Sequence, residues 1–165
     1  MESKKLILDA CCGGKMFWYD KNFPHALYID KRRCKEKLQD GREFDVSPDI
    51  VADFTCLPFE DEAFNLVVFD PPHLKRAGKN SWLAKKYGVL PADWKECIRK
   101  GFSECFRVLK NGGVLIFKWS CCQIPFYEVI KLAPHSPILG DKKGETRWTV
   151  FMKVGKGGDS NEQKR

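Results

Sequence analysis

One stretch of the sequence decides the fold: residues 64–73, Phe64-Asn65-Leu66-Val67-Val68-Phe69-Asp70-Pro71-Pro72-His73. Its apolar run, residues 66–69, is short enough for a buried parallel strand and too short for a helix. The run stops at an acid followed by two prolines, which fix their own φ angles and donate no backbone hydrogen bond. We therefore expect a rigid, extended turn that holds the Asp70 carboxylate and the His73 imidazole at the end of a central strand.

Four further apolar runs predict more parallel strands, at residues 6–8, 26–29, 50–52 and 114–117. The first four strands in chain order each end in an aspartate: Asp9, Asp30, Asp53 and Asp70. In a parallel sheet these acids share the carboxyl edge, where open α/β folds bind their ligands. An aspartate after a strand also caps turns and helices, but four such acids after four strands favour a shared ligand crevice.

The turn after the first strand is rich in small residues: Asp9-Ala10-Cys11-Cys12-Gly13-Gly14-Lys15. Small residues and paired glycines let the backbone approach a ligand closely, and we expect a short helix to follow through residues 16–18. Asp30 lies 21 residues after Asp9, about where a βαβ unit places the acid that receives a ribose hydroxyl pair. Asp53 and Phe54 offer an acceptor for an adenine amino group and an apolar wall for its ring, although Phe54 also suits core packing.

The rest of the chain predicts further helices and a terminal strand pair. Residues 31–37 predict a basic, solvent-facing helical turn, and residues 41–48 a loop. Residues 93–96 resemble a capping box for an amphipathic helix that runs to Leu109, with residues 111–113 as its C-terminal cap. A second helix is expected over residues 122–132, and residues 138–139 and 148–154 predict an antiparallel strand pair. We expect one domain over residues 1–154 and a disordered polar tail over residues 155–165.

The segment after His73 is basic and aromatic, and residues 74–87 contain no acid. Cations interleaved with aromatic residues suit a surface that grips phosphates and stacks bases. The alternative is a solvated loop whose aromatic side chains pack on the core. The candidate substrate-binding residues are Lys75, Arg76, Lys79, Trp82, Lys85, Lys86 and Tyr87.

Composition limits the class of protein. A chain of 165 residues with 43% hydrophobic residues suits one globular domain, and no apolar run is long enough for a membrane span or a signal peptide. We therefore expect a cytoplasmic protein. The eight cysteines include no C-x-x-C spacing, so neither a zinc site nor a disulfide framework is expected. The formal net charge of +7 indicates an anionic partner.

These motifs resemble those of the class I S-adenosylmethionine-dependent methyltransferases, especially the enzymes that methylate the amino group of adenine in nucleic acids. Those enzymes carry an Asp- or Asn-Pro-Pro-aromatic motif after the fourth strand, matched by residues 70–73. Their first motif often reads Asp-Pro-Ala-Cys-Gly-Ser-Gly, matched by residues 9–15, and residues 109–113 are also similar to the class. The resemblance covers roughly residues 5 to 154. Lys15 and His73 depart from the pattern, standing where the family has a glycine and a Tyr, Phe or Trp.

The resemblance implies a single Rossmann-like methyltransferase domain with a mostly parallel seven-stranded sheet, an antiparallel C-terminal strand and helices on both faces. It also implies S-adenosylmethionine as the cofactor and no metal. The implied cofactor-binding residues are Asp9, Ala10, Cys11, Cys12, Gly13, Lys15, Asp30, Asp53 and Phe54, and the implied catalytic residues are Asp70, Pro71, Pro72 and His73.

In the implied mechanism, Asp70 and the Pro71 carbonyl accept the protons of the base amine. This returns lone-pair density to the nitrogen that faces the sulfonium methyl group. His73 would stack on a flipped base or act on a proton.

Two alternatives stay open: an inactive subunit of this fold that binds cofactor or nucleic acid, and an N-methyltransferase of small molecules or proteins. The intact Asp70-Pro71-Pro72 argues against the inactive subunit, whereas the missing target-recognition domain argues for it. Target reading would then depend on DNA or RNA structure, on a short sequence context or on a partner protein. A homodimer also stays open.

Overall fold

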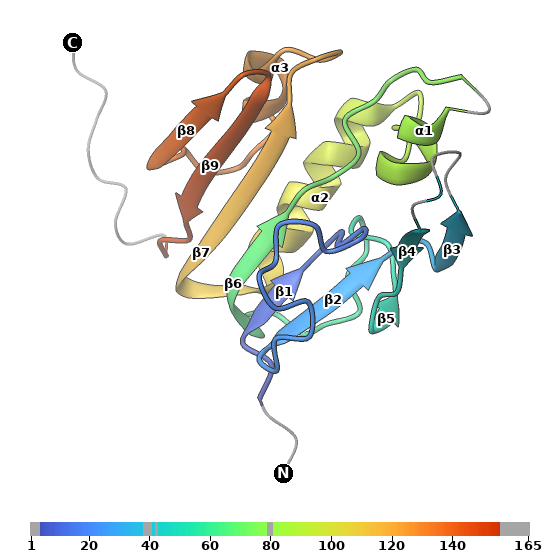
Figure 1. Ribbon diagram of the computed structural model, residues 1–165. Helices are drawn as coiled ribbons and strands as arrows, with labels where there is room; N and C mark the ends of the chain where they lie inside the picture. The colour runs from blue at the N-terminus through green and yellow to red at the C-terminus, as the bar shows by residue number, and fades with distance from the viewer. Residues whose placement is uncertain (1–3, 38–40, 42, 79–80, 156–165) are drawn as a thin grey trace.

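The computed structural model describes residues 4–37, 41, 43–78 and 81–155, and a seven-stranded sheet forms its centre (Figure 1). The strand order is β5-β2-β1-β6-β7-β9-β8. The first five of these strands run parallel, and β9 is antiparallel to both β7 and β8. The predicted Rossmann-like, mostly parallel sheet with one antiparallel strand is confirmed. The strands are β1 (Ile7–Asp9), β2 (Ala26–Asp30), β5 (Ile50–Val51), β6 (Phe64–Phe69), β7 (Leu109–Ser120), β8 (Leu139–Lys143) and β9 (Thr146–Met152).

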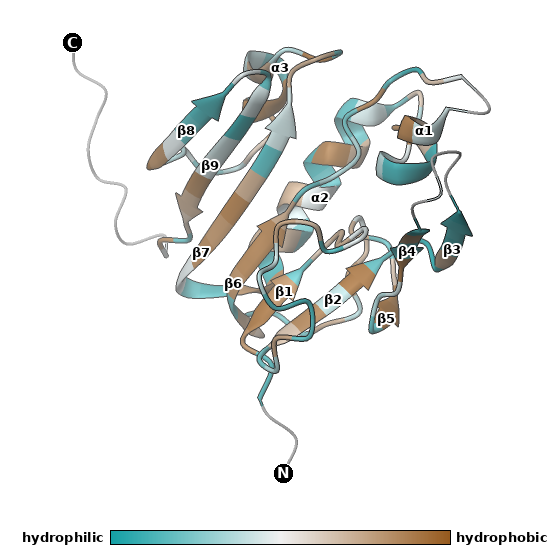
Figure 2. Ribbon diagram, in the orientation of Figure 1, coloured by the Kyte–Doolittle hydropathy of each residue, from teal (hydrophilic) through white to brown (hydrophobic). Residues whose placement is uncertain are grey.

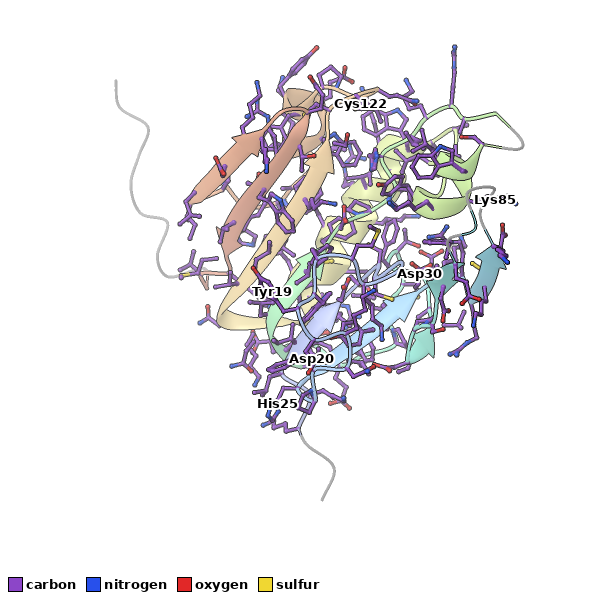
Figure 3. The ribbon with its side chains drawn as sticks, in the orientation of Figure 1. Tyr19, Asp20, His25, Asp30, Lys85 and Cys122 are labelled. Atoms are coloured by element: carbon purple, nitrogen blue, oxygen red, sulfur yellow. The ribbon has the colours of Figure 1, made fainter. Side chains whose placement is uncertain are left out.

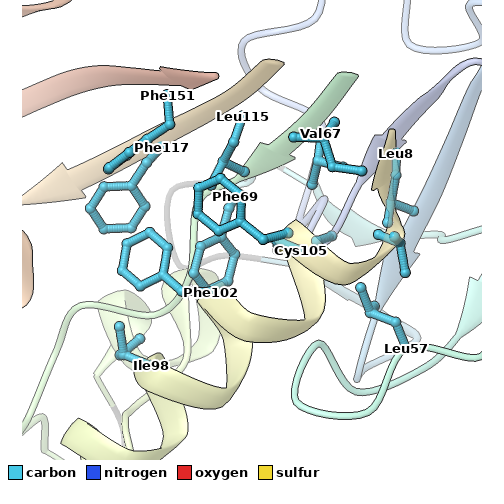
Figure 4. Close-up of a cluster of buried hydrophobic side chains, with 14 of the residues drawn as sticks. Leu8, Leu57, Val67, Phe69, Ile98, Phe102, Cys105, Leu115, Phe117 and Phe151 are labelled. Carbon is cyan, nitrogen blue, oxygen red and sulfur yellow. The ribbon is translucent and has the colours of Figure 1, made fainter. Parts of the chain in front are cut away.

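The core lies between this sheet and helix α2 (Trp94–Val108), and Figure 4 shows its side chains. The ring centroid of Phe102 on α2 lies 5.4 Å from that of Phe69 on β6 and 4.8 Å from that of Phe117 on β7. A Cβ atom at Gly101 would lie only 2.6 Å from the Phe69 ring, so the glycine lets the helix approach the sheet closely. This packing fixes the end of β6, and Asp70 is the residue that follows it.

The hydropathy of the elements follows their burial. Figure 2 shows apolar residues along β6 and β7 and polar residues along β3. The short helices α1 (Trp82–Tyr87) and α3 (Phe126–Ile130) flank the sheet near the carboxyl ends of its parallel strands (Figure 1). None of the helices in the described ranges has the length and apolar character of a membrane span.

The connection from β1 to β2 consists of turns, so the predicted helix at residues 16–18 is wrong. The Trp18 indole is the reason. Its Nε1 donates to Asp9 Oδ2 at 2.7 Å, and its ring meets the Tyr28 ring edge-on with centroids 4.9 Å apart. Lys15 has a φ of 52°, which a helix cannot contain. The indole and the buried acid thus hold this segment against the sheet.

A hairpin replaces the helical turn predicted at residues 31–37, and that prediction is wrong. Strands β3 (Cys34–Lys37) and β4 (Glu43–Val46) pair antiparallel, and β4 falls within the predicted loop of residues 41–48. Phe44 and Val46 alternate with exposed acids, and both apolar side chains are buried. This alternation with a period of two stabilises a strand rather than a helix.

The C-terminal half follows the prediction with shifted ends. Helix α2 begins at Trp94, but the Asp93 side chain makes no capping hydrogen bond, so the capping box is wrong. The helix ends at Val108, and residues 111–113 lie inside β7 instead of capping it. Helix α3 is shorter than predicted because Pro125 is its N-cap.

The expected terminal pair is confirmed as β8 and β9, although β8 is longer than the two residues predicted. The predicted disordered tail lies outside the described residues apart from Gly155, whose N–H donates to Asn111 Oδ1 at 2.8 Å.

Candidate functional site

A pocket with a volume of about 470 Å³ opens at the carboxyl edge of the parallel strands. Its wall combines the turn after β1 (residues 11–14), the segment after β2 (residues 30–32), the end of β6 (residues 70–73) and the end of α1 (residues 86–89). Figure 3 shows Asp30 at the end of β2 and Lys85 on the neighbouring α1. The volume lies in the range of small-molecule and cofactor sites, and the position is where open α/β sheets bind ligands.

The corner after β6 brings a carboxylate into this pocket. Asp70 Oδ2 accepts a hydrogen bond from Lys118 Nζ at 2.7 Å, and both side chains are largely shielded, with 18% and 24% of their surfaces exposed. Burial raises the pKa of Asp70 above its ordinary value, and the Lys118 ammonium acts in the opposite direction. Pro71 is buried and Pro72 lines the pocket. The two prolines hold the acid at the strand end.

His73 lies beside aromatic residues on the same wall. Its ring centroid is 5.1 Å from that of Tyr87 on α1 and 6.3 Å from that of Trp119 on β7. Burial and the charge of Lys118 lower the pKa of His73 to about 4. The imidazole is therefore neutral at neutral pH, which suits a flat stacking surface better than a proton carrier at that pH.

Asp30 links the turn after β1 to helix α1 through Arg32. Its Oδ2 accepts from Gly13 N at 3.0 Å, and its Oδ1 accepts from Arg32 N at 2.9 Å and Arg32 Nε at 3.2 Å. Arg32 Nη1 in turn donates to the carbonyl oxygen of Lys85 on α1 at 2.7 Å. Each carboxylate oxygen has two lone-pair sites, so Asp30 keeps acceptor capacity for a ligand hydroxyl. Four of the predicted cofactor-binding residues, Asp30, Cys11, Cys12 and Gly13, lie in the pocket wall.

Three predicted cofactor residues lie behind or beside the pocket. Asp9 and Ala10 are buried, with 0% and 1% of their surfaces exposed, and neither lines the pocket. Burial is the main cause that raises the pKa of Asp9 to about 7. Lys15 points away: its Nζ donates to the Lys21 carbonyl oxygen at 3.2 Å and lies 3.9 Å from the centroid of the Tyr28 ring. Asp9 therefore supports the turn after β1 from the side away from the pocket, where its carboxylate accepts hydrogen bonds from Trp18 Nε1 and Cys11 N.

Asp53 and Phe54 separate into two roles. The Asp53 carboxylate accepts from Lys31 Nζ at 2.9 Å and from Thr55 N and Oγ1, and it does not line the pocket. Phe54 does line the pocket, and its ring centroid lies 5.3 Å from that of Phe69. The structure thus places the Phe54 ring in the pocket wall, whereas the Asp53 carboxylate is engaged outside it.

The basic segment contributes two of its residues to the pocket. Lys86 and Tyr87 line it, and Lys86 Nζ lies 5.0 Å from the centroid of the Tyr87 ring. Lys85 instead donates to Glu36 Oε2 on β3 at 2.7 Å, and Trp82 is 48% exposed.

The start of the basic segment is tied to another loop. The N–H groups of Lys75 and Arg76 both donate to Gln123 Oε1, which keeps this backbone outside the pocket lining. Lys79 lies outside the described residues.

Sequence reasoning missed several pocket residues, among them Lys118, Arg32 and Phe17. Lys118 carried a signal, because it interrupts an apolar strand one residue beyond the run that predicted it. Arg32 fell in a segment interpreted as a solvated helical turn, and Phe17 in the predicted helix.

The described residues contain no group of three or more His, Cys, Asp or Glu side chains placed to hold a metal ion. All eight cysteines are free thiols. Burial raises the pKa values of Cys11 and Cys12, so both thiols are neutral at neutral pH.

No family model matches the sequence, and no curated protein matches it. Solved structures match its fold over nearly the whole chain. The fold is that of the S-adenosylmethionine-dependent methyltransferases. One such enzyme from Methanosarcina mazei has a TM-score of 0.55 and 12% identity, over 93% of this chain and 94% of that chain. The PH0226 protein from Pyrococcus horikoshii has a TM-score of 0.60 and 18% identity, over 93% and 84%.

A Haloferax volcanii methyltransferase, solved in complex with the Trm112 methyltransferase activator, has a TM-score of 0.50. It is 13% identical to this chain, and the match covers 94% of this chain and 84% of that one.

Proposed function

We propose that the protein is an S-adenosylmethionine-dependent methyltransferase that methylates an exocyclic base amine of DNA or RNA, most directly that of adenine. One observation carries the proposal. A single pocket of about 470 Å³ joins the glycine-containing turn after β1 to the Asp70-Pro71-Pro72-His73 corner after β6. A methyl donor bound at the turn would therefore face a substrate held at the corner.

The cofactor side of the pocket fits the proposed ligand. A Cβ atom built on Gly13, whose φ is +49°, has no atom within 4 Å, so the backbone borders open space there. Asp30 would accept from ribose hydroxyls, and Phe54 would flank the adenine ring. When bound, S-adenosylmethionine supplies an electrophilic methyl group on its sulfonium.

The substrate side fits an amine conjugated to a ring. Such an amine is a poor nucleophile because its lone pair is shared with the ring. Asp70 and the Pro71 carbonyl would accept hydrogen bonds from its two N–H groups and restore density on the nitrogen, as preorganised acceptors. Neutral His73 would stack on the base, with Tyr87 behind it at a centroid distance of 5.1 Å.

Nucleic acid is the proposed partner because of the net charge of +7 and the position of Lys86 at the pocket. A protein partner is a further possibility to test, since the Haloferax volcanii methyltransferase of similar fold was solved with an activator. A second copy of this chain is the other partner to test, and size-exclusion chromatography of the purified protein would detect a homodimer.

The direct test supplies methyl-labelled S-adenosylmethionine and separate pools of single-stranded DNA, duplex DNA and total RNA. We expect label in at least one pool and its release as N-methylated base after digestion. Asp70→Ala should reduce labelling about a hundredfold or more, because it removes one amine acceptor. Asp70→Asn keeps one acceptor oxygen and should retain more activity than Asp70→Ala.

Asp141→Ala is the matched control, because Asp141 is an exposed acid on β8 away from this pocket. Cofactor binding without label in any pool would favour the inactive subunit. Two further pools, of small amines and of proteins, test the other alternative, which label in either of them but in no nucleic acid would favour. Equal labelling by Asp70→Ala and the unmodified protein would refute the assigned role of Asp70.

A further inference from the structure

Lys118 is a cation in a strand that is otherwise apolar at this end. On β7 it lies between Phe117 and Trp119, which are both buried on the side of α2. Because side chains alternate along a strand, Lys118 points to the opposite face. Phe117 pairs in register with Phe69 on β6, which places Lys118 beside the residue that follows Phe69, Asp70.

The ammonium of Lys118 is held by three groups. Its Nζ lies 2.7 Å from Asp70 Oδ2, 5.7 Å from the centroid of the Phe17 ring and 5.7 Å from that of the Trp148 ring. A lysine side chain has four flexible carbons, so contacts on several sides are needed to fix its charge. The three contacts come from different elements: the end of β6, the β1–β2 connection and β9.

The electrostatic surroundings of Asp70 make this cation important. The charge of Asp70 acts on Asp9 at the end of β1 and on Cys11 in the turn, and the charge of Lys118 acts on His73, three residues along the chain from Asp70. None of these three supplies positive charge at neutral pH, because the imidazole and the thiol are neutral and Asp9 is an acid. Within the part of the chain that the structure describes, Lys118 is the cation that acts on Asp70.

The ionisation of Asp70 decides what it can do for an amine. A carboxylate only accepts hydrogen bonds, whereas a protonated carboxyl group also presents an O–H donor. An amine that donates two hydrogen bonds needs two acceptors. An O–H group on Asp70 would place a donor opposite the N–H donors of the amine. Burial alone favours the protonated form, so an opposing charge is required.

We propose that Lys118 is a positioning residue that keeps the Asp70 side chain ionised and fixed as an acceptor for the substrate amine. The Lys118–Asp70 ion pair is observed in the structure, whereas the identity of the substrate as an amine rests on the proposed function. We expect the Lys118–Asp70 ion pair to contribute to the chemistry of the site and little to the stability of the fold, because a shielded ion pair stabilises a fold little or not at all.

The test measures the ionisation of Asp70 directly, without any substrate. The protein is labelled with 13C at aspartate carboxyl groups and titrated by NMR, with Asp70→Asn to assign the signal. In Lys118→Met we expect the Asp70 midpoint to rise by about 1–3 pH units. Lys118→Arg should restore a midpoint near that of the unmodified protein. Lys118→Gln gives a second neutral side chain in case Lys118→Met does not fold.

Lys110→Met is the matched control, since Lys110 lies on the same strand and donates to Asn65 Oδ1, outside the pocket. It should leave the Asp70 midpoint unchanged. An Asp70 midpoint that also stays unchanged in Lys118→Met and Lys118→Gln would overturn the proposal.

The same variants are then assayed for methyl transfer across pH. In Lys118→Met we expect activity to be lost below the new Asp70 midpoint and to recover as the pH rises above it, whereas Lys118→Arg keeps the original profile. If the unmodified protein methylates no substrate, the proposed function fails, and the carboxyl titration still decides the role of Lys118. A shifted midpoint with an unchanged activity profile would refute its role in the reaction.

Discussion

Asp9 gives the most quantitative prediction, because it is a fully buried carboxyl group with a perturbed pKa. None of its surface is exposed, its Oδ2 accepts from Trp18 Nε1 at 2.7 Å, and its pKa is raised from 3.8 to about 7. A difference of about three units between the pKa of Asp9 in the unfolded and native states corresponds to about 4 kcal/mol in the free energy of unfolding. Asp9→Asn removes the titration while it keeps the shape and one acceptor oxygen.

The sign of the effect follows from which state loses its proton first. Below about pH 3 both states are protonated, and Asp9 does not change the free energy of unfolding. As the pH rises, the unfolded chain ionises at 3.8 while the native protein holds its proton until about 7, so stability falls over this interval. Above it the cost is constant. About 2.5 kcal/mol of the cost should accumulate between about pH 5 and about pH 8.

The assay is urea unfolding followed by tryptophan fluorescence at a series of pH values, for the unmodified protein and Asp9→Asn. The difference between the two free energies of unfolding isolates Asp9 from other groups that titrate in both proteins. We expect Asp9→Asn to gain relative stability steadily from about pH 5 to about pH 8. Asp141→Asn, on the exposed β8, controls for the loss of one surface carboxyl group. A difference that stays flat across this range would refute the reasoning.

Three further predictions concern His73, Gly101 and Arg107. The imidazole of His73 should titrate by NMR near pH 4, because burial and Lys118 disfavour its charge, so the activity profile should show no step from it near pH 6.5. Gly101→Ala should cost about 1–3 kcal/mol in urea unfolding, since its Cβ would lie 2.6 Å from Phe69. Arg107→Ala should cost about 1–3 kcal/mol in the same assay, because its guanidinium bonds Glu104, Asp61 and the carbonyl oxygens of residues 57 and 59.

Matched variants separate these effects from general ones. Gly78→Ala is the control for Gly101, because an added Cβ there meets no atom within 4 Å. Arg99→Ala controls for Arg107, since Arg99 forms an exposed ion pair with Glu96 on the same helix. Equal losses in a variant and its control would contradict the corresponding prediction. A His73 midpoint near 6.5 would contradict the assigned environment of the imidazole.

The sheet could be predicted from the sequence because its central strands are apolar runs with sharp ends. The Asp-Pro-Pro sequence after residue 69 marks one end, and the periodic apolar residues of α2 mark the layer above it. Parallel strands then place their carboxyl ends together, which is why Asp30 and Asp70 could be assigned to one pocket before any coordinates.

The remaining parts depend on contacts between distant residues. The turn at residues 16–18 has helix-compatible composition, but the Trp18 indole gains a hydrogen bond to Asp9 and a packed face on Tyr28. In β3, the charged sequence of residues 34–37 carries little apolar signal, and only its pairing with Val46 and Phe44 makes it a strand. Tertiary context overrides local propensity in both segments.

A lysine inside a strand is usually interpreted as facing solvent, which is why Lys118 was missed. Its role depends on the acid opposite it on β6, and the pairing of β6 with β7 cannot be obtained from either strand alone. The same holds for Arg32, whose partners come from residue 30 and from α1.

Arg32 connects two walls of the pocket. Its guanidinium bonds the acid on the proposed cofactor side at 3.2 Å and a backbone carbonyl oxygen of α1 on the proposed substrate side at 2.7 Å. A ligand that shifts this group at Asp30 would change the placement of α1, and a ligand seated against α1 would change the group at Asp30. Thermodynamic linkage requires the two effects to be equal, so each ligand would alter the affinity for the other by the same factor. One side chain would thus couple the affinities of the two halves of the pocket.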